Sequence, residues 1–109
     1  MRAGRMDRKI TFQRKVEARD GYGSVTFTWQ DVARDVWAEK VEQRGREYLA
    51  AKQHTPEMQR IYRVRYRSDV DTTMRVLADG QGWDIQHVAE LGRRRGLEIT
   101  CKVPGENHG

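Results

Sequence analysis

The sequence predicts one small, mainly β domain over residues 1–109, an antiparallel β-barrel or sandwich of about six or seven strands with one short helix. Several stretches alternate apolar and polar residues with a period of two, which is typical of half-buried strands. Turn-forming pairs such as Asp-Gly separate these stretches at short intervals. Leu, Ile, Val and Phe together number only 20 of the 109 residues, which indicates a single domain with a thin core. We expect residues 1–7 and 104–109 to be flexible ends.

The first elements form a hairpin. Residues 8–16 and 24–29 both alternate, and residues 19–23 between them carry the Asp-Gly chemistry of a turn. Together they predict a β-hairpin over the first 29 residues. Residues 31–34 interrupt the alternation and predict a break, after which residues 35–41 resume as a strand.

The middle of the chain combines a helical pattern with a strand. Residues 46–53 favour helix and lie between Gly45 and Pro56, so we expect one short helix there. The segment could equally be an extended arm, because isolated helices of about two turns are marginally stable. Residues 57–67 form the most regular predicted strand, with apolar and aromatic side chains on one face and arginines on the other.

The last part of the chain predicts a second hairpin and a final strand. Residues 74–78 and 83–88 flank residues 79–82, a glycine-rich connection. Residues 91–96 form a basic loop, and residues 97–103 alternate again.

A thin core calls for stabilisation from outside the domain, and the composition limits its source. Cys101 is the only cysteine, so no intrachain disulfide is available, and the three histidines share no zinc-ligand spacing. Self-association or a partner remains. No run approaches the ~20 apolar residues of a membrane span, and there is no apolar signal core, so we expect a soluble, intracellular protein.

Catalytic constellations are weak, and we expect neither an enzyme nor a bound cofactor or metal. The two serines lie outside any nucleophile elbow, and no glycine-rich loop precedes a helix. Cys101 alternates within an apolar strand face, which favours a buried structural thiol. His87 shares the parity of Trp83 and is expected in the core, while Asp69 and Asp71 lie at a turn, where Asp caps backbone amides.

Two basic features remain, in a chain with 16 arginines and 5 lysines. Four arginines fall at positions 60, 63, 65 and 67, and Arg93, Arg94 and Arg95 form a run between two glycines. They could contact DNA phosphates. The alternative is that they pair with acidic residues of neighbouring chains or solvate a sheet face, and composition alone favours this alternative.

The aromatic residues do not add a nucleic-acid signal. Trp29, Trp37, Tyr62 and Trp83 fall at strand positions that are expected to face a core. An exposed platform for base stacking is therefore not indicated.

The order of these elements resembles the head–tail joining, or head-closure, proteins of tailed phages and prophages. Each motif alone is unspecific, but together they cover nearly the whole chain in the right order. The motifs are residues 3–14 (AGRMDRKITFQR), 20–23 (DGYG), 28–29 (TW), 36–38 (VWA), 45–48 (GREY), 65–67 (RYR), 74–76 (MRV), 83–85 (WDI) and 92–99 (GRRRGLEI). Gly80-Gln81-Gly82-Trp83 departs from the pattern, because a bulkier polar hairpin tip is expected there.

The resemblance implies a structural virion protein that forms a ring beneath the portal of a tailed phage. Such a ring lies between a head-side adaptor protein and the tail-end (tail terminator) protein, and double-stranded DNA passes through its channel. It would be located in the virion, after assembly in the bacterial host cytoplasm, without any role for a membrane.

Within such a ring, we expect two groups of residues to make different contacts. The candidates for contact with DNA at the channel lumen are Arg93, Arg94, Arg95, Gly80 and Gln81. The candidates for a subunit interface are Arg63, Arg65, Arg67, Arg46, Glu47 and Tyr48. The alternative function is a free-standing nucleic-acid-binding β-barrel, which would show salt-sensitive affinity for DNA as a monomer.

Overall fold

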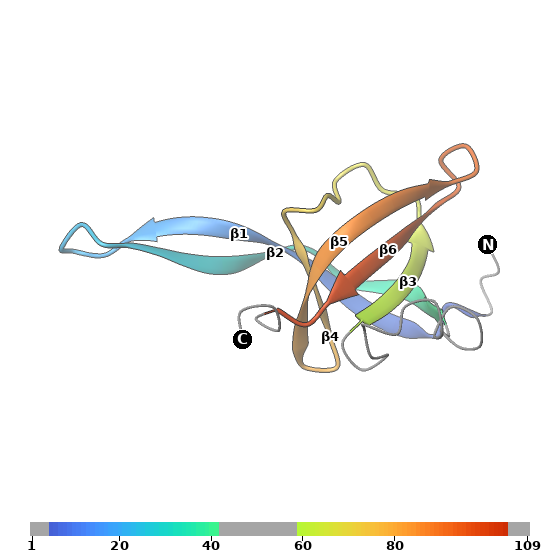
Figure 1. Cartoon of the computed structure of the whole chain (residues 1–109), viewed down its shortest axis with the longest axis horizontal. Helices are drawn as coiled ribbons and strands as arrows, with labels where there is room; N and C mark the ends of the chain where they lie inside the picture. The colour runs from blue at the N-terminus through green and yellow to red at the C-terminus, as the bar shows by residue number, and fades with distance from the viewer. Residues whose placement is uncertain (1–4, 42–58, 105–109) are drawn as a thin grey trace.

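The computed structural model describes residues 5–41 and 59–104, which form one closed antiparallel β-barrel with the strand order β1-β2-β3-β6-β5-β4 (Figure 1). The prediction of a mainly β barrel is confirmed, and the described residues contain no α-helix. The helix expected over residues 46–53 lies outside them. The strands are β1 (Arg8–Arg19), β2 (Val25–Val41), β3 (Gln59–Arg65), β4 (Arg75–Ala78), β5 (Gln81–Leu91) and β6 (Gly96–Lys102).

The first hairpin is confirmed, but the predicted break at residues 31–34 is wrong. β2 runs without interruption through this segment, and the register against β1 shifts on both sides of Phe12. Asp35 adopts a positive φ of 52°, and its backbone N–H donates to Thr11 Oγ1 at 3.3 Å. The irregular residues are therefore absorbed as β-bulges, which disturb alternation without ending a strand.

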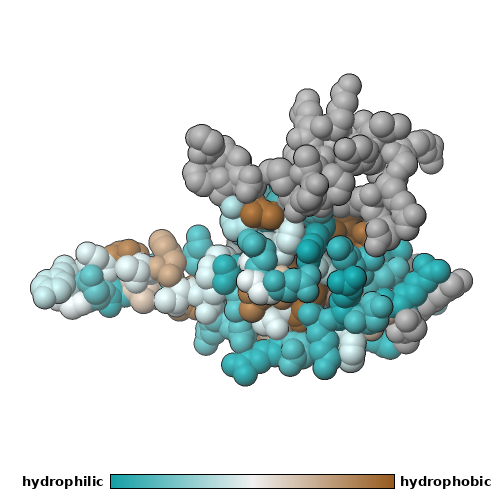
Figure 2. Space-filling view, turned by 90° about the horizontal axis from the view of Figure 1, so that it is seen from below, coloured by the Kyte–Doolittle hydropathy of each residue, from teal (hydrophilic) through white to brown (hydrophobic). Residues whose placement is uncertain are grey.

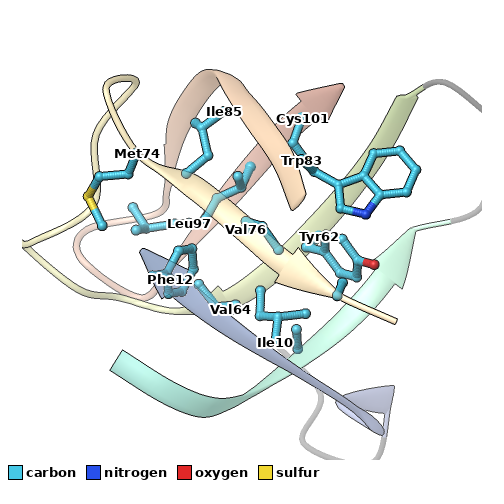
Figure 3. Close-up of a cluster of buried hydrophobic side chains, with 13 residues drawn as sticks. Ile10, Phe12, Tyr62, Val64, Met74, Val76, Trp83, Ile85, Leu97 and Cys101 are labelled. Atoms are coloured by element: carbon cyan, nitrogen blue, oxygen red, sulfur yellow. The ribbon is translucent and has the colours of Figure 1, made fainter. Parts of the chain in front are cut away.

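The core lies inside the barrel and receives side chains from all six strands (Figure 3). Inward-facing residues alternate along β3, where Tyr62 and Val64 are buried, and along β6, where Leu97, Ile99 and Cys101 are buried. The remaining buried members of this cluster are Ile10, Phe12, Ala38, Met74, Val76, Ala78, Trp83 and Ile85.

Three residues expected in the core lie elsewhere. Trp37 is 51% exposed, because the small Ala38 next to it faces inward and sends Trp37 to the outer surface, under Lys9 Nζ at 4.8 Å from the ring centroid. Trp29 is only half-buried. His87 is exposed because a bulge between Ile85 and His87 inserts one residue and reverses the parity.

Cys101 has the buried position that its strand pattern predicts. Its Sγ lies 3.5 Å from the backbone oxygen of Arg60, and burial raises the pKa of the thiol to about 12. Because the folded-state pKa exceeds the unfolded-state pKa, the unfolded chain loses its thiol proton first as the pH rises. The contribution of this group to the free energy of unfolding is therefore fully present below the unfolded-state pKa and is lost as the pH rises towards 12.

We therefore expect the free energy of unfolding to fall by about 2 kcal/mol between pH 8 and pH 10 because of Cys101, whose unfolded thiol has a pKa of about 8.5. Urea unfolding curves at both pH values measure this fall. In Cys101→Ala the difference between the two pH values should shrink by that amount. An equal fall in both proteins would contradict the assignment.

The second hairpin has a tighter turn than predicted. Ala78 pairs with Gln81, so only Asp79 and Gly80 form the turn, and Gln81 and Gly82 belong to β5. Asp79 and Gly80 both have positive φ, 53° and 73°, which is the conformation of a type I′ turn. A Cβ at Gly80 would meet nothing within 4 Å, so space does not require a glycine at this position. The positive φ of the backbone does.

Gly80→Ala is expected to lower the free energy of unfolding by about 1–2 kcal/mol through backbone strain alone. Gly21→Ala is the matched control, because Gly21 also lies in an open hairpin turn but lacks a positive φ. Thermal or urea unfolding should leave that control within about 0.5 kcal/mol of the parent. Equal losses in the two variants would show that positive φ is not the cause.

Candidate interaction surfaces

The basic turn between β5 and β6 is a structured, exposed cationic tip. Gly92 and Arg94 have positive φ, and the turn is closed by the Arg95 N–H, which donates to the Leu91 oxygen at 3.2 Å. The Arg94 N–H donates to Glu90 Oε2 at 2.9 Å. All three arginine side chains of this tip are exposed, and none forms an ion pair with another described residue. Three positive charges are thus available to an external anion.

The other predicted lumen candidates, Gly80 and Gln81, lie at the opposite end of β5 (Figure 1). This strand has 11 residues, which corresponds to about 35 Å. Asp79 at this turn binds Arg60 Nη1 at 2.8 Å, and this hydrogen bond holds the pKa of Asp79 below its ordinary value. The Asp79–Gly80 turn therefore presents a paired carboxylate and no free cation.

Arg60 is held in the barrel by three contacts. Its guanidinium lies 4.3 Å from the Trp83 ring centroid and donates to Tyr62 Oη at 2.9 Å, in addition to the bond with Asp79. Such stacking and hydrogen bonding use the planar guanidinium in a way that lysine could not. Arg60 therefore belongs to the barrel structure.

Of the three arginines predicted on one strand face, Arg63 and Arg65 lie on β3 and Arg67 follows its end, and two of the three are engaged within the chain. Arg63 Nε binds Glu98 Oε2 at 2.9 Å, and Arg67 binds Asp69 through two hydrogen bonds of 3.0 Å. Arg65 is exposed and makes no ion pair with the described residues. The other interface candidates, Arg46, Glu47 and Tyr48, lie outside the described part of the chain.

A surface that the sequence did not predict is a two-stranded arm that projects from the barrel (Figure 1). β1 pairs with β4 only as far as Gln13, whereas its pairing with β2 continues to Arg19↔Val25. Residues 14–30 therefore extend beyond the barrel as a ribbon, which we call the arm. Lys15, Glu17 and Arg19 all fall on one parity of β1, which is a sequence signal that this face of the arm is exposed.

One face of the arm carries an apolar row at Val25, Phe27 and Trp29. Val25 is 45% and Phe27 57% exposed, and Figure 2 shows apolar residues on the arm surface. Lys15 Nζ lies 5.0 Å from the Phe27 ring centroid and 5.7 Å from that of Trp29. An exposed apolar row of this kind is typical of a contact surface.

The base of the arm is fixed to the barrel by a hydrogen-bonded set from three strands. Gln13 Nε2 donates to Asp31 Oδ1 at 2.7 Å, and Arg75 Nε donates to Gln13 Oε1 at 2.8 Å. The bonds from Gln13 and from Arg34 hold the pKa of Asp31 below its ordinary value. Arg75 also stacks on Trp29, with its Cζ 4.3 Å from the ring centroid. The arm therefore has a defined direction relative to the barrel.

The tip of the arm is also ordered by side-chain bonds. Asp20 Oδ1 accepts hydrogen bonds from the backbone N–H groups of Tyr22 at 2.8 Å and Ser24 at 2.9 Å. This Asx-type arrangement fixes the turn. It presents the Tyr22 side chain, which is 96% exposed, at the end of the arm.

The acidic residues near the arm base have structural roles, and no cluster that could bind a metal ion lies among the described residues. Asp71 accepts hydrogen bonds from the Thr73 N–H and hydroxyl, which is the capping role predicted for it.

An open groove of about 620 Å³ at the arm base is lined by residues of both charge signs, including Arg14, Lys15 and Asp69. Over residues 5–41 and 59–104 no group of three or more His, Cys, Asp or Glu is placed to hold a metal ion. No helix in these ranges is long and apolar enough to cross a membrane.

Comparison with known proteins identifies the family of the chain and several structures of similar fold. The family model described as phage head completion protein matches residues 1–104. The solution structure of protein SF1141 from Shigella flexneri 2a is similar with a TM-score of 0.74 and 26% identity, covering 97% of this chain and 99% of that one. A chain in the virion of a native gene transfer agent particle is similar in fold, with a TM-score of 0.59, 20% identity, and coverage of 90% and 94%. No curated protein matches.

Proposed function

Because the chain belongs to the phage head completion protein family, and so is a structural component of a phage virion, we propose that it is a ring subunit of the head–tail connector. The ring would close the DNA-filled head and provide the surface to which the tail docks. Its partners would be further copies of itself, the head-side adaptor protein beneath the portal, the tail terminator protein and the double-stranded DNA in the channel. It would assemble in the host cytoplasm and remain in the virion.

The observation that carries this proposal is the family match over residues 1–104, which spans both the barrel and the arm. The thin core supports it, because a subunit that buries additional surface against neighbours needs less internal burial. A chain of this fold in a gene transfer agent virion gives further support. A cyclic ring requires two different complementary patches on each subunit.

The surfaces described above suggest a division of contacts within the ring. The free charges of Arg93, Arg94 and Arg95 suit DNA phosphates, whereas the Asp79–Gly80 turn offers a carboxylate that is already paired. Arg65 has its charge available for a neighbouring subunit. The role we propose is structural and non-catalytic, with charge and shape as the functional properties.

Purification of the tagged full chain together with the neighbouring virion proteins, followed by electron microscopy, tests the proposal. We expect rings that contain this chain, and phage lacking it should accumulate filled heads without tails. A monomer that binds DNA with a steep dependence on salt concentration, and that associates with no virion protein, would instead support the free-standing nucleic-acid-binding barrel.

A further inference from the structure

Each strand of the arm has one edge without a partner strand in the described part of the chain. The second edge of β2 pairs with β3 only over Ala38 to Val41, and the second edge of β1 pairs with β4 only over Thr11 to Gln13. In the arm, residues 25–30 of β2 and 14–19 of β1 pair only with each other. The barrel closes its own edges, so the arm carries open edges on an otherwise closed sheet.

The hydrogen bonds of the hairpin identify which backbone groups face outward. The Asp20 N–H donates to the Ser24 oxygen at 3.0 Å, so this pair belongs to the hydrogen-bonded set of the ladder. Since hydrogen-bonded and non-hydrogen-bonded pairs alternate, three pairs direct their N–H and C=O groups away from each other. These are Lys15 with Trp29, Glu17 with Phe27, and Arg19 with Val25.

The two open edges have different chemistry. The β2 segment, residues 25–30, reads VTFTWQ and contains no charge, proline or glycine, the residues that commonly protect an edge. The β1 segment, residues 14–19, has four charged residues among six. A centred two-fold pairing of two β1 edges would oppose Lys15 to Arg19 and Glu17 to Glu17, which is repulsive. The uncharged β2 edge accepts the charged β1 edge without such a clash.

We propose that the open β2 edge of one arm pairs antiparallel with the open β1 edge of the arm of a neighbouring copy of this chain. The pairing repeats the register of the arm itself, so that Trp29 lies opposite Lys15, Phe27 opposite Glu17 and Val25 opposite Arg19 of the neighbouring copy. All outward N–H and C=O groups of these residues are then hydrogen-bonded. The neighbour's Lys15 adds a second ammonium group beside the apolar row.

This pairing is heterologous, as a ring requires. β1 of every arm runs in the same direction, so successive arms stand side by side and point the same way, and rotation closes the series. The inference rests on the proposed ring function and names the contact between its subunits. Two-fold pairing of two β2 edges is the competing arrangement, which gives a closed dimer and leaves both β1 edges open.

Mixed single-cysteine variants test the pairing. In the proposed interface Val16 of one chain lies opposite Thr28 of the next as a non-hydrogen-bonded pair, with a Cα separation of about 4.5 Å that permits a disulfide. Full-length Val16→Cys and Thr28→Cys chains carrying different tags are assembled together with the neighbouring virion proteins and oxidised. We expect a disulfide between the two variants, identified by mass spectrometry, and none when either variant is assembled alone. Cys101 is buried and stays unmodified.

A control mixture of Thr26→Cys with Thr28→Cys reports on the two-fold pairing and should remain uncross-linked. Cross-linking of that mixture in place of the first overturns the proposal, as does a disulfide from Thr28→Cys to a different virion protein. Rings without the first cross-link overturn this inference and leave the proposed function intact. Absence of the chain from any ring overturns both.

A backbone variant provides a second, independent test. Phe27→Pro removes an outward N–H that the hairpin itself does not use, whereas Phe27→Ala removes the same aromatic ring and keeps the N–H. Relative to Phe27→Ala, the proline should lower the Val16→Cys to Thr28→Cys cross-link by about tenfold, since one hydrogen bond and its unpaired acceptor are worth about 1.4 kcal/mol. Equal cross-linking in the two backgrounds would show that the β2 edge is not paired.

Discussion

Phe12→Ala is expected to lower the free energy of unfolding by about 3–5 kcal/mol, a large part of the stability of a domain of this size. Phe12 is fully buried, and it lies on β1 at the position where β1 also pairs with β4. The surrounding barrel cannot collapse into the space, because closure fixes the positions of the strands. Urea unfolding followed by circular dichroism measures the loss.

Phe27→Ala is the matched control, since it removes the same side chain from the same hairpin at an exposed site of the arm. It should change the free energy of unfolding of the isolated chain by less than about 1 kcal/mol. Similar losses at both positions would mean that the arm face is covered within the monomer, and would argue against its role as a contact surface.

Reversal of charge at Arg93, Arg94 and Arg95 to glutamate is expected to abolish retention of packaged DNA while rings still form. The three side chains are exposed and have no acidic partner among the described residues, and Arg94 Cζ lies 5.8 Å from the Tyr66 ring centroid, a long contact, so the fold depends little on their charge. For purified rings, the slope of log affinity for DNA against log salt concentration should become shallower by about 0.9 for each phosphate that the variant ring no longer neutralises.

Two controls accompany this reversal. Replacing the three arginines with lysine should preserve retention, because phosphate contacts of this kind require positive charge and no specific geometry. Arg65→Glu reverses the charge at the exposed site proposed for a subunit contact, so it should weaken ring formation itself, the opposite pattern to the triple glutamate variant. Nuclease protection of the genome in filled heads measures retention, and electron microscopy measures ring formation. Loss of rings in the triple glutamate variant would refute the separate roles of turn and interface.

Strand identity could be predicted from the sequence because alternation is a local signal. Tyr62, Val64, Leu97 and Ile99 share the predicted inward parity of their strands, and all are buried. The errors arise where a bulge changes the parity, since one extra residue moves every following side chain to the other face. His87 is exposed for this reason. The prediction for Trp37 is wrong for another reason. The pleat of the strand decides which of two neighbouring residues faces the core, and here it directs the small Ala38 inward and the large Trp37 outward.

The candidate site was predictable only in its local part. The Arg93 to Arg95 turn lies within one hairpin and was located from its residues alone. The engagement of Arg63 by Glu98 depends on the pairing of β3 with β6, and these residues are 35 positions apart. The arm depends on where β4 stops pairing with β1, which no pattern within β1 or β2 states. Long-range register therefore decides which charges and apolar residues remain available.

The fixed base of the arm has a mechanical consequence. A force applied to the arm is not absorbed by a loose hinge, because Gln13, Asp31 and Arg75 connect the arm to three strands of the barrel. The load passes to the seam between β1 and β4, which consists of three residue pairs, Thr11↔Leu77, Phe12↔Val76 and Gln13↔Arg75. This seam has three pairs, against four each between β2 and β3 and between β4 and β5, so we expect it to separate first when the arm is pulled. A pulled arm would therefore turn about its hydrogen-bonded base, and the β1–β4 pairing is the part of the barrel that we expect to fail first.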